Sequence, residues 1–125
     1  MISRNKEFML TLKQVKQNIK DDPANWSIHL MDFVDDFRYY HDQRMIGEPF
    51  ELDDERFDAL LAATAEQLCY ELKIKPPEWI LSAPAPRDPW FVSGMESLKA
   101  IALVESPLPF RLRKIFVLEN FLSRV

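Results

Sequence analysis

Residues 57–72 read FDALLAATAEQLCYEL, and this stretch decides the fold class of the chain. Its large apolar residues return every three or four positions, a spacing typical of a broad apolar helix face. The alanines between them raise helix propensity and permit a neighbouring helix to approach closely. Asp53 or Asp54 is suited to cap the start of this helix, and Pro76-Pro77 ends it.

Two further helices are predicted before this stretch. The first covers about residues 3–20, with an apolar stripe formed by Phe8, Leu12, Val15 and Ile19 and a polar side carrying Lys13, Lys16 and Lys20. Asp22 is suited to cap the second, with Pro23 at its first position. That helix runs to about His41, and its stripe consists of Trp26, Leu30, Phe33, Val34 and Phe37. Gly47 and Pro49 mark the loop that follows.

The chain after residue 76 is predicted to alternate short helices with loops. Residues 77–81 form a single turn, and the proline-rich stretch 83–89 forms an ordered loop. Ser93-Gly94-Met95-Glu96 matches a capping box that opens a helix over about residues 94–105. We expect that helix to bury Leu98, Ile101, Ala102 and Val104. A short helix is predicted around residues 110–114. Residues 115–118 fit either an extended or a helical conformation. Residues 119–125 are predicted to form a final turn with Phe121 and Leu122 facing inward.

Composition agrees with these elements. Two glycines against nine prolines disfavour β-hairpins, whose turns need glycine. A length of 125 residues suits one core. We therefore predict an all-α fold, a compact bundle of four to six helices with a proline-rich ordered loop, in one domain over residues 1–125. With one cysteine, Cys69, and neither a secretory signal nor a membrane span, we expect a cytoplasmic protein in which Cys69 is a buried core residue.

Charge is unevenly distributed along the chain. The net charge is −4, yet residues 1–20 carry +4, residues 32–58 carry −7 and residues 107–125 carry +3. This polarity predicts two contact surfaces, since charged patches steer association. The predicted acidic partner-binding face consists of Asp32, Asp35, Asp36 and Asp42. The predicted basic surface, for a partner or for nucleic acid, consists of Arg111, Arg113 and Lys114.

Standard catalytic constellations are missing from the sequence. Gly47 and Gly94 stand alone, so there is no glycine-rich phosphate loop. His29, Asp32, Asp36 and His41 lie on or near one helix and are the candidates for a metal or enzyme site. A solvated acidic face is the favoured interpretation, because no second motif of this kind exists. We predict no catalytic residue, no metal and no cofactor. Trp79, Trp90 and Phe91 are candidates to line a groove, although core anchoring is favoured.

The second half of the chain also resembles a known group of proteins. The resemblance covers about residues 55–125 and rests on PEW at 77–79, PWF at 89–91, LVESP at 103–107 and FRLRKIFV at 110–117, in that order. The group comprises uncharacterised bacterial helix-turn-helix regulators, similar to antitoxin-type partners of nucleotidyltransferase-like toxins. The resemblance implies partner binding. Residues 1–50 lack two short helices around a tight turn, so DNA reading does not carry over.

We therefore expect a non-enzymatic protein-interaction module, antitoxin-like or regulatory, whose partner is another bacterial protein. Homo-oligomerisation is compatible with the sequence, and membrane association is not expected. One alternative is a nucleic-acid-associated regulator that uses the basic terminal segments, with Lys13, Lys16, Lys20, Arg111, Arg113 and Lys114. A second alternative is a helical enzyme or metal site around His29, Asp32, Asp36 and His41.

Overall fold

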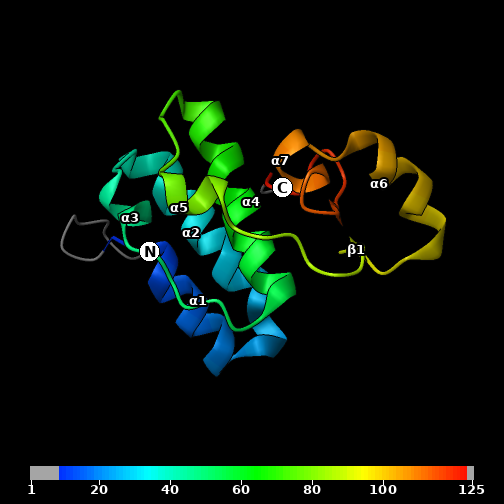
Figure 1. The fold of residues 1–125 in the computed structure, drawn as a ribbon, viewed down its shortest axis with the longest axis horizontal. Helices are drawn as coiled ribbons and strands as arrows, with labels where there is room; N and C mark the ends of the chain where they lie inside the picture. The colour runs from blue at the N-terminus through cyan, green and yellow to red at the C-terminus, as the bar shows by residue number, and fades with distance from the viewer. Residues whose placement is uncertain (1–8, 124–125) are drawn as a thin grey trace.

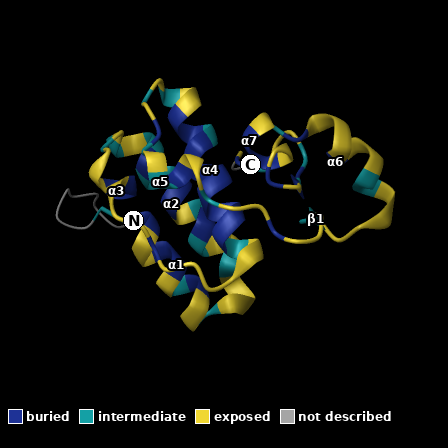
Figure 2. Ribbon diagram, viewed as in Figure 1, coloured by how far each residue is buried: buried dark blue, intermediate teal, exposed yellow. Residues whose placement is uncertain are grey.

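Helix α4 (Glu55–Leu72) is the central element of the computed structural model, which describes residues 9–123 (Figure 1). Asp54 caps its first turn, because the Asp54 carboxylate accepts a hydrogen bond from the backbone N–H of Phe57 at 3.1 Å. Lys73 ends the helix in a left-handed conformation with φ of 60°. Most of its length is buried, including the run from Asp58 to Glu66 (Figure 2).

Two amphipathic helices pack against α4. Helix α1 (Leu12–Asp21) is capped by Thr11, and the short 3-10 helix η2 (Pro23–Asn25) leads directly into α2 (Trp26–Tyr40). The buried stripes match the predicted ones and contribute Leu12, Val15, Ile19, Leu30, Phe33, Val34 and Phe37 to the core. Phe8 lies outside the described residues. The first helix begins later than predicted, because Thr11 provides a side-chain cap that residues 9 and 10 cannot.

Short elements complete this part of the molecule. Helix α3 (Arg44–Gly47) lies where the sequence predicted a loop marked by Gly47 and Pro49, and α5 (Glu78–Leu81) is the predicted single turn. Trp79 ties the two together, since its indole N–H donates to the backbone carbonyl of Ile46 at 2.9 Å. We refer to residues 11–81, from α1 to α5 with the cap Thr11, as the bundle.

The remaining chain forms an arm at one end of the bundle. The proline-rich loop crosses to strand β1 (Trp90–Phe91), which pairs in parallel with β2 (Ile115–Phe116), so the extended alternative for residues 115 and 116 is the observed one. Between the strands lie η3 (Glu96–Leu98), α6 (Lys99–Glu105) and α7 (Leu108–Arg111). Figure 1 shows α6 at the far end of the molecule from the N-terminal helices. We call residues 90–123 the arm.

The predicted capping box does not form. The residue before η3 is Met95 rather than Ser93, and it offers no capping side chain. Gly94 adopts a positive φ of 70°, which turns the chain there, and the Ser93 hydroxyl accepts a bond from the backbone N–H of Met95 instead. Glu96 forms an ion pair with Lys99 at 3.0 Å. The helix therefore starts later, and its first turn is 3-10.

The all-α fold is confirmed, with the two-residue strands as its only sheet among residues 9–123. The division into one domain stays a prediction. Within the described part of the chain, no helix has the length and apolar character needed to cross a membrane.

Candidate interaction surface

The charge polarity of the sequence is largely neutralised inside the bundle. Lysines on α1 pair with acids of the segment that precedes and opens α4. Lys13 lies 2.7 Å from a carboxylate oxygen of Glu48, and Lys20 lies 2.7 Å from one of Asp53. These N-terminal cations therefore contact the acidic middle of the same chain.

Lys16 corrects the prediction of a solvent-facing lysine stripe. Its side chain is 6% exposed, and its ammonium lies 2.6 Å from Asp58 and 2.7 Å from Asp53. It also donates to the backbone carbonyl of Glu51. Burial of the ammonium is tolerated because two carboxylates and a carbonyl surround it. Hydrogen bonds from Lys16 and then Lys20 lower the pKa of Asp53 to about 2.

The predicted acidic face lies on and after α2. Asp32 is exposed, and Asp35, Asp36 and Asp42 are half-buried. Asp42 holds the guanidinium of Arg44, with a shortest distance of 2.7 Å. Each of the four carboxylates takes part in an interaction within the molecule. Their role in partner binding stays a prediction.

The predicted basic surface is divided by the fold. Arg111 and Lys114 are exposed, whereas Arg113 is buried with 5% of its surface exposed. The Arg113 guanidinium pairs with Glu66 at 2.8 Å and donates to the carbonyls of Pro109 and Ile80. Arg113 is therefore a structural link between α4, α5 and α7, which corrects its placement on a contact surface.

The candidate metal or enzyme residues do not converge. His29 lies 3.0 Å from Asp22, whose carboxylate also accepts from Asn25. These two hydrogen bonds, first that from Asn25, lower the pKa of Asp22. His41 is exposed at the end of α2. Among residues 9–123, no three histidine, cysteine, aspartate or glutamate residues gather in a way that fits a metal ion.

Cys69 and the three aromatic residues that were candidates to line a groove pack against other side chains of the chain. Cys69 is buried, as predicted, and burial followed by the nearby Glu66 raises the pKa of its thiol to about 11. Trp79 and Trp90 pack against the core, and Phe91 stacks on Phe116 with centroids 4.9 Å apart. The favoured interpretation of these rings as anchors agrees with the contacts.

Helix α6 departs most from its sequence prediction. Of its seven described residues, Ala102 alone is buried. Ile101 and Val104 were expected in the core, yet both are exposed, Val104 to 77%, and Leu98 is half-buried. The main neighbours of α6 are the short elements η3 and β2, and no long helix of the described chain packs closely against it. Figure 2 shows the contrast between this exposed helix and the buried α4.

The exposed apolar side chains continue onto α7. Leu108 and Leu112 are 60% and 67% exposed and lie one turn apart, with the Leu112 amide bonded to the Leu108 carbonyl. Arg111 connects them to α6, because its guanidinium donates to the carbonyl of Val104 at 3.3 Å and of Ser106 at 2.9 Å. We define the distal face as Ile101, Leu103, Val104, Leu108 and Leu112.

A groove of about 570 Å³ borders this face. It lies between α6 and the C-terminal segment, and its apolar side chains are Leu98, Ile101 and Leu118. Two acids line it as well: Glu105 at the end of α6 and Glu119, whose backbone N–H donates to the Glu105 carboxylate at 3.0 Å. An apolar lining with carboxylates beside it favours an apolar segment that carries positive charge.

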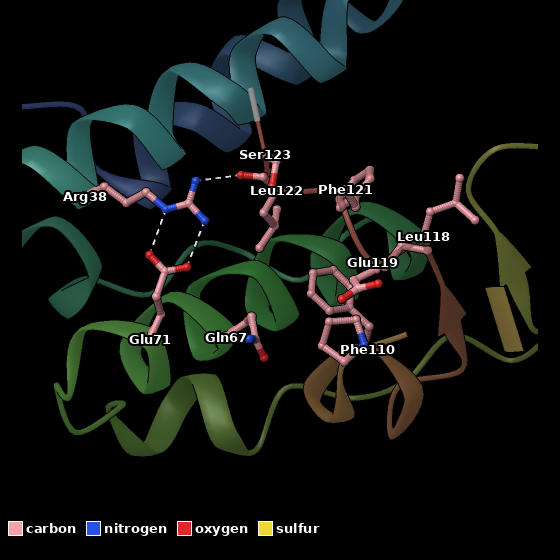
Figure 3. A pocket seen from close by; sticks show the side chains of 11 residues that line it. Arg38, Gln67, Glu71, Phe110, Leu118, Glu119, Phe121, Leu122 and Ser123 are labelled. Atoms are coloured by element: carbon pink, nitrogen blue, oxygen red, sulfur yellow. Dashed lines mark hydrogen bonds and ion pairs between the residues drawn. The ribbon is translucent and has the colours of Figure 1, made fainter. Parts of the chain in front are cut away.

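A second, smaller pocket of about 140 Å³ lies between the bundle and the C-terminal segment (Figure 3). Arg38 spans it by a two-pronged ion pair with Glu71, each bond 2.8 Å, and by a bond of 2.6 Å to the carbonyl of Leu122. In Figure 3 the Gln67 side chain lies beside this pair. The guanidinium is thus already engaged, and this pocket holds the C-terminal segment against α2 and α4.

Comparison of the chain with protein-family models, with curated proteins and with solved structures found no match. The candidate site therefore rests on the geometry alone. More than half of the exposed large apolar side chains among residues 9–123 lie between Met95 and Leu112. The sequence contained one signal for this: five of the seven positions in α6, residues 100–104, are apolar, which is more than one buried stripe needs.

Proposed function

We propose that this protein is a non-enzymatic protein-interaction module that docks a partner protein through the distal face. The observation that carries the proposal is the exposure of five large apolar side chains on one short segment, α6–α7. Contiguous apolar surface of this kind is rare on monomers and marks interaction sites.

The energetics favour a covered state of this face. Moving one Val, Leu or Ile side chain from water to a buried site is worth roughly 1.5–3 kcal/mol. Val104 and Leu112 are each more than two-thirds exposed, so most of that gain is unrealised in the isolated chain. A partner that covers them recovers it, and the exposed Arg111 beside them has the chemistry of an interface anchor.

The charge distribution supports a protein partner over nucleic acid. Lys16 and Arg113 are buried in ion pairs, and Lys13 and Lys20 contact acids of the same chain. The exposed members of the basic set that the nucleic-acid alternative requires are thus Lys13, Lys20, Arg111 and Lys114, and the first two are paired with acids of the same chain. The resemblance to antitoxin-type partners concerns residues 55–125, which include the distal face, and it accords with a role in partner binding.

Site-specific photo-crosslinking in cells tests the proposal. A photoreactive residue replaces Val104 in one variant and exposed Gln17 on α1 in the control. We expect a discrete protein adduct at position 104 and none at position 17, and we expect Leu112→Glu to abolish the adduct at 104. Absence of any adduct at position 104, and at positions 101 and 112 when the photoreactive residue is moved there, contradicts the proposed function.

A further inference from the structure

The groove beside α6 has a defined chemistry. Leu98, Ile101 and Leu118 supply apolar surface, and Glu105 and Glu119 place two carboxylates next to it. A segment that fits here presents apolar side chains with cations beside them. An uncharged or acidic segment leaves the two carboxylates without a counter-charge across the interface.

The chain itself presents such a segment. On α7 and the turn after it, Leu108 and Leu112 project from the surface at 60% and 67% exposure. Exposed Arg111 and Lys114 lie next to them in the sequence, and the Lys114 ammonium also donates to the carbonyl of Arg87 at 3.2 Å. We call these four residues the ridge. It matches the groove in both respects, since leucines face an apolar lining and cations face carboxylates.

Ridge and groove border one another along the same protomer. The Arg111 guanidinium contacts the carbonyl of Val104, and the next residue, Glu105, lines the groove. This adjacency is compatible with a two-fold arrangement of two copies in which each ridge enters the other groove. Such reciprocal contacts close on themselves and produce a dimer instead of a filament.

From this complementarity we infer that the partner of the distal face is a second copy of this chain, in a symmetric dimer held by reciprocal ridge-in-groove contacts. The inference rests on the proposed function and specifies its partner. Helix α6 lies in the interface, and Val104 is covered in the dimer.

Analytical ultracentrifugation of the full chain over a wide concentration range tests the dimer. We expect the mass to rise from 14.7 kDa to twice that value. Leu112→Glu raises the dimer dissociation constant at least roughly tenfold, because a buried leucine is lost and a charge is introduced. The matched control is Ile28→Glu, which changes an equally apolar, 56% exposed residue on α2 and leaves the dimer intact.

Charge reversal provides the sharper test. Glu105→Lys with Glu119→Lys makes groove and ridge both basic, and Arg111→Glu with Lys114→Glu makes both acidic. Each double variant is expected to be monomeric alone, whereas an equimolar mixture forms a heterodimer because both of its contacts join opposite charges. Circular dichroism confirms that each variant keeps its helices.

Two outcomes overturn the inference: a wild-type chain that stays at 14.7 kDa at every concentration, or a dimer unaffected by Leu112→Glu and by both charge reversals. A monomer that still crosslinks through position 104 to a different protein overturns the dimer and leaves the proposed function standing. Absence of all adducts together with a monomer removes both.

Discussion

The bundle and helix α6 of the arm handle apolar surface in opposite ways, whereas Phe110 and Ile115 of the arm are fully buried in the same core as α4. In the bundle, α4 is buried over most of its length, and helices α1 and α2 place their full apolar stripes against it. In the arm, α6 buries Ala102 and leaves Ile101, Leu103 and Val104 in solvent. The same kind of amphipathic sequence therefore forms a core in one region and an open surface in the other.

Charge shows the reverse distribution. The bundle encloses an ion pair between Lys16 and Asp58. A second buried ion pair joins Glu66 of the bundle to Arg113 of the arm. The exposed cations of the arm, Arg111 and Lys114, lie beside apolar side chains. Electrostatics thus stabilises the inside of this fold, and the surface available for recognition is mainly apolar.

Breaking the buried ion pair between arm and bundle is expected to have the largest effect. Arg113→Met leaves Glu66 buried without its cation and costs roughly 3–5 kcal/mol of the free energy of unfolding. Exposed Arg111→Met, the matched control, costs less than about 1 kcal/mol. Urea denaturation of both variants measures the difference, and equal losses contradict the placement of Arg113 in the interior.

Leucine truncation compares the two regions directly. Leu61→Ala on α4 removes a fully buried side chain and costs roughly 2–5 kcal/mol. Leu103→Ala on α6 changes the stability of dilute protein by no more than about 0.5 kcal/mol, because that side chain is already half in water. Thermal and urea unfolding provide the readout, and a large loss for Leu103→Ala contradicts an open distal face.

The junction at the end of α6 is expected to have an intermediate effect. The Ser106 hydroxyl is buried, lies 2.5 Å from the carbonyl of Ala102 and 3.0 Å from that of Val117 as acceptors for its single proton, and accepts from the Val117 N–H at 2.8 Å. Ser106→Ala leaves that N–H unpaired and costs roughly 1–3 kcal/mol. Ser123→Ala, at an exposed position of the arm, is the control, and similar losses for both contradict the buried bridge.

Acid titration of the bundle is expected to show the smallest effect. The pKa of Asp53 falls from its ordinary value of 3.8 to about 2 in the folded chain. Its contribution is therefore complete above about pH 4 and is lost as the pH falls toward 2. Urea midpoints measured between pH 5 and 2 should fall less steeply in Asp53→Asn than in the wild type. Parallel slopes contradict the pairing of Asp53 with Lys16 and Lys20.

Sequence periodicity predicts the helices of the bundle well. The stripes of α1, α2 and α4 return at helical spacing over two or more turns within the described residues, and each lies mainly on the buried face. The cap at Asp54 and the single turn at α5 follow from local chemistry that a sequence displays directly. These features depend on neighbours within a few positions along the chain.

The remaining features depend on contacts between distant positions. In the sequence, Lys16 is indistinguishable from the other two lysines of its stripe. In the fold it differs from them because Asp58, 42 positions later, forms a buried ion pair with it. Arg113 reads as part of a basic run until α4 brings Glu66 beside it. For α6, periodicity identifies an apolar face and cannot say whether the same chain covers it. That uncovered face is the candidate site.

Hydrogen exchange tests the central claim most directly. That claim is that the chain itself covers the apolar core of the bundle, whereas the distal face on the arm needs a partner to cover it. In the Leu112→Glu variant, we predict that amides of α4 exchange slowest and that those of α6 exchange many-fold faster through local opening. In concentrated wild-type protein, the α6 amides should slow while those of α4 stay unchanged. Amides of α6 as protected as those of α4 in the variant would contradict the division.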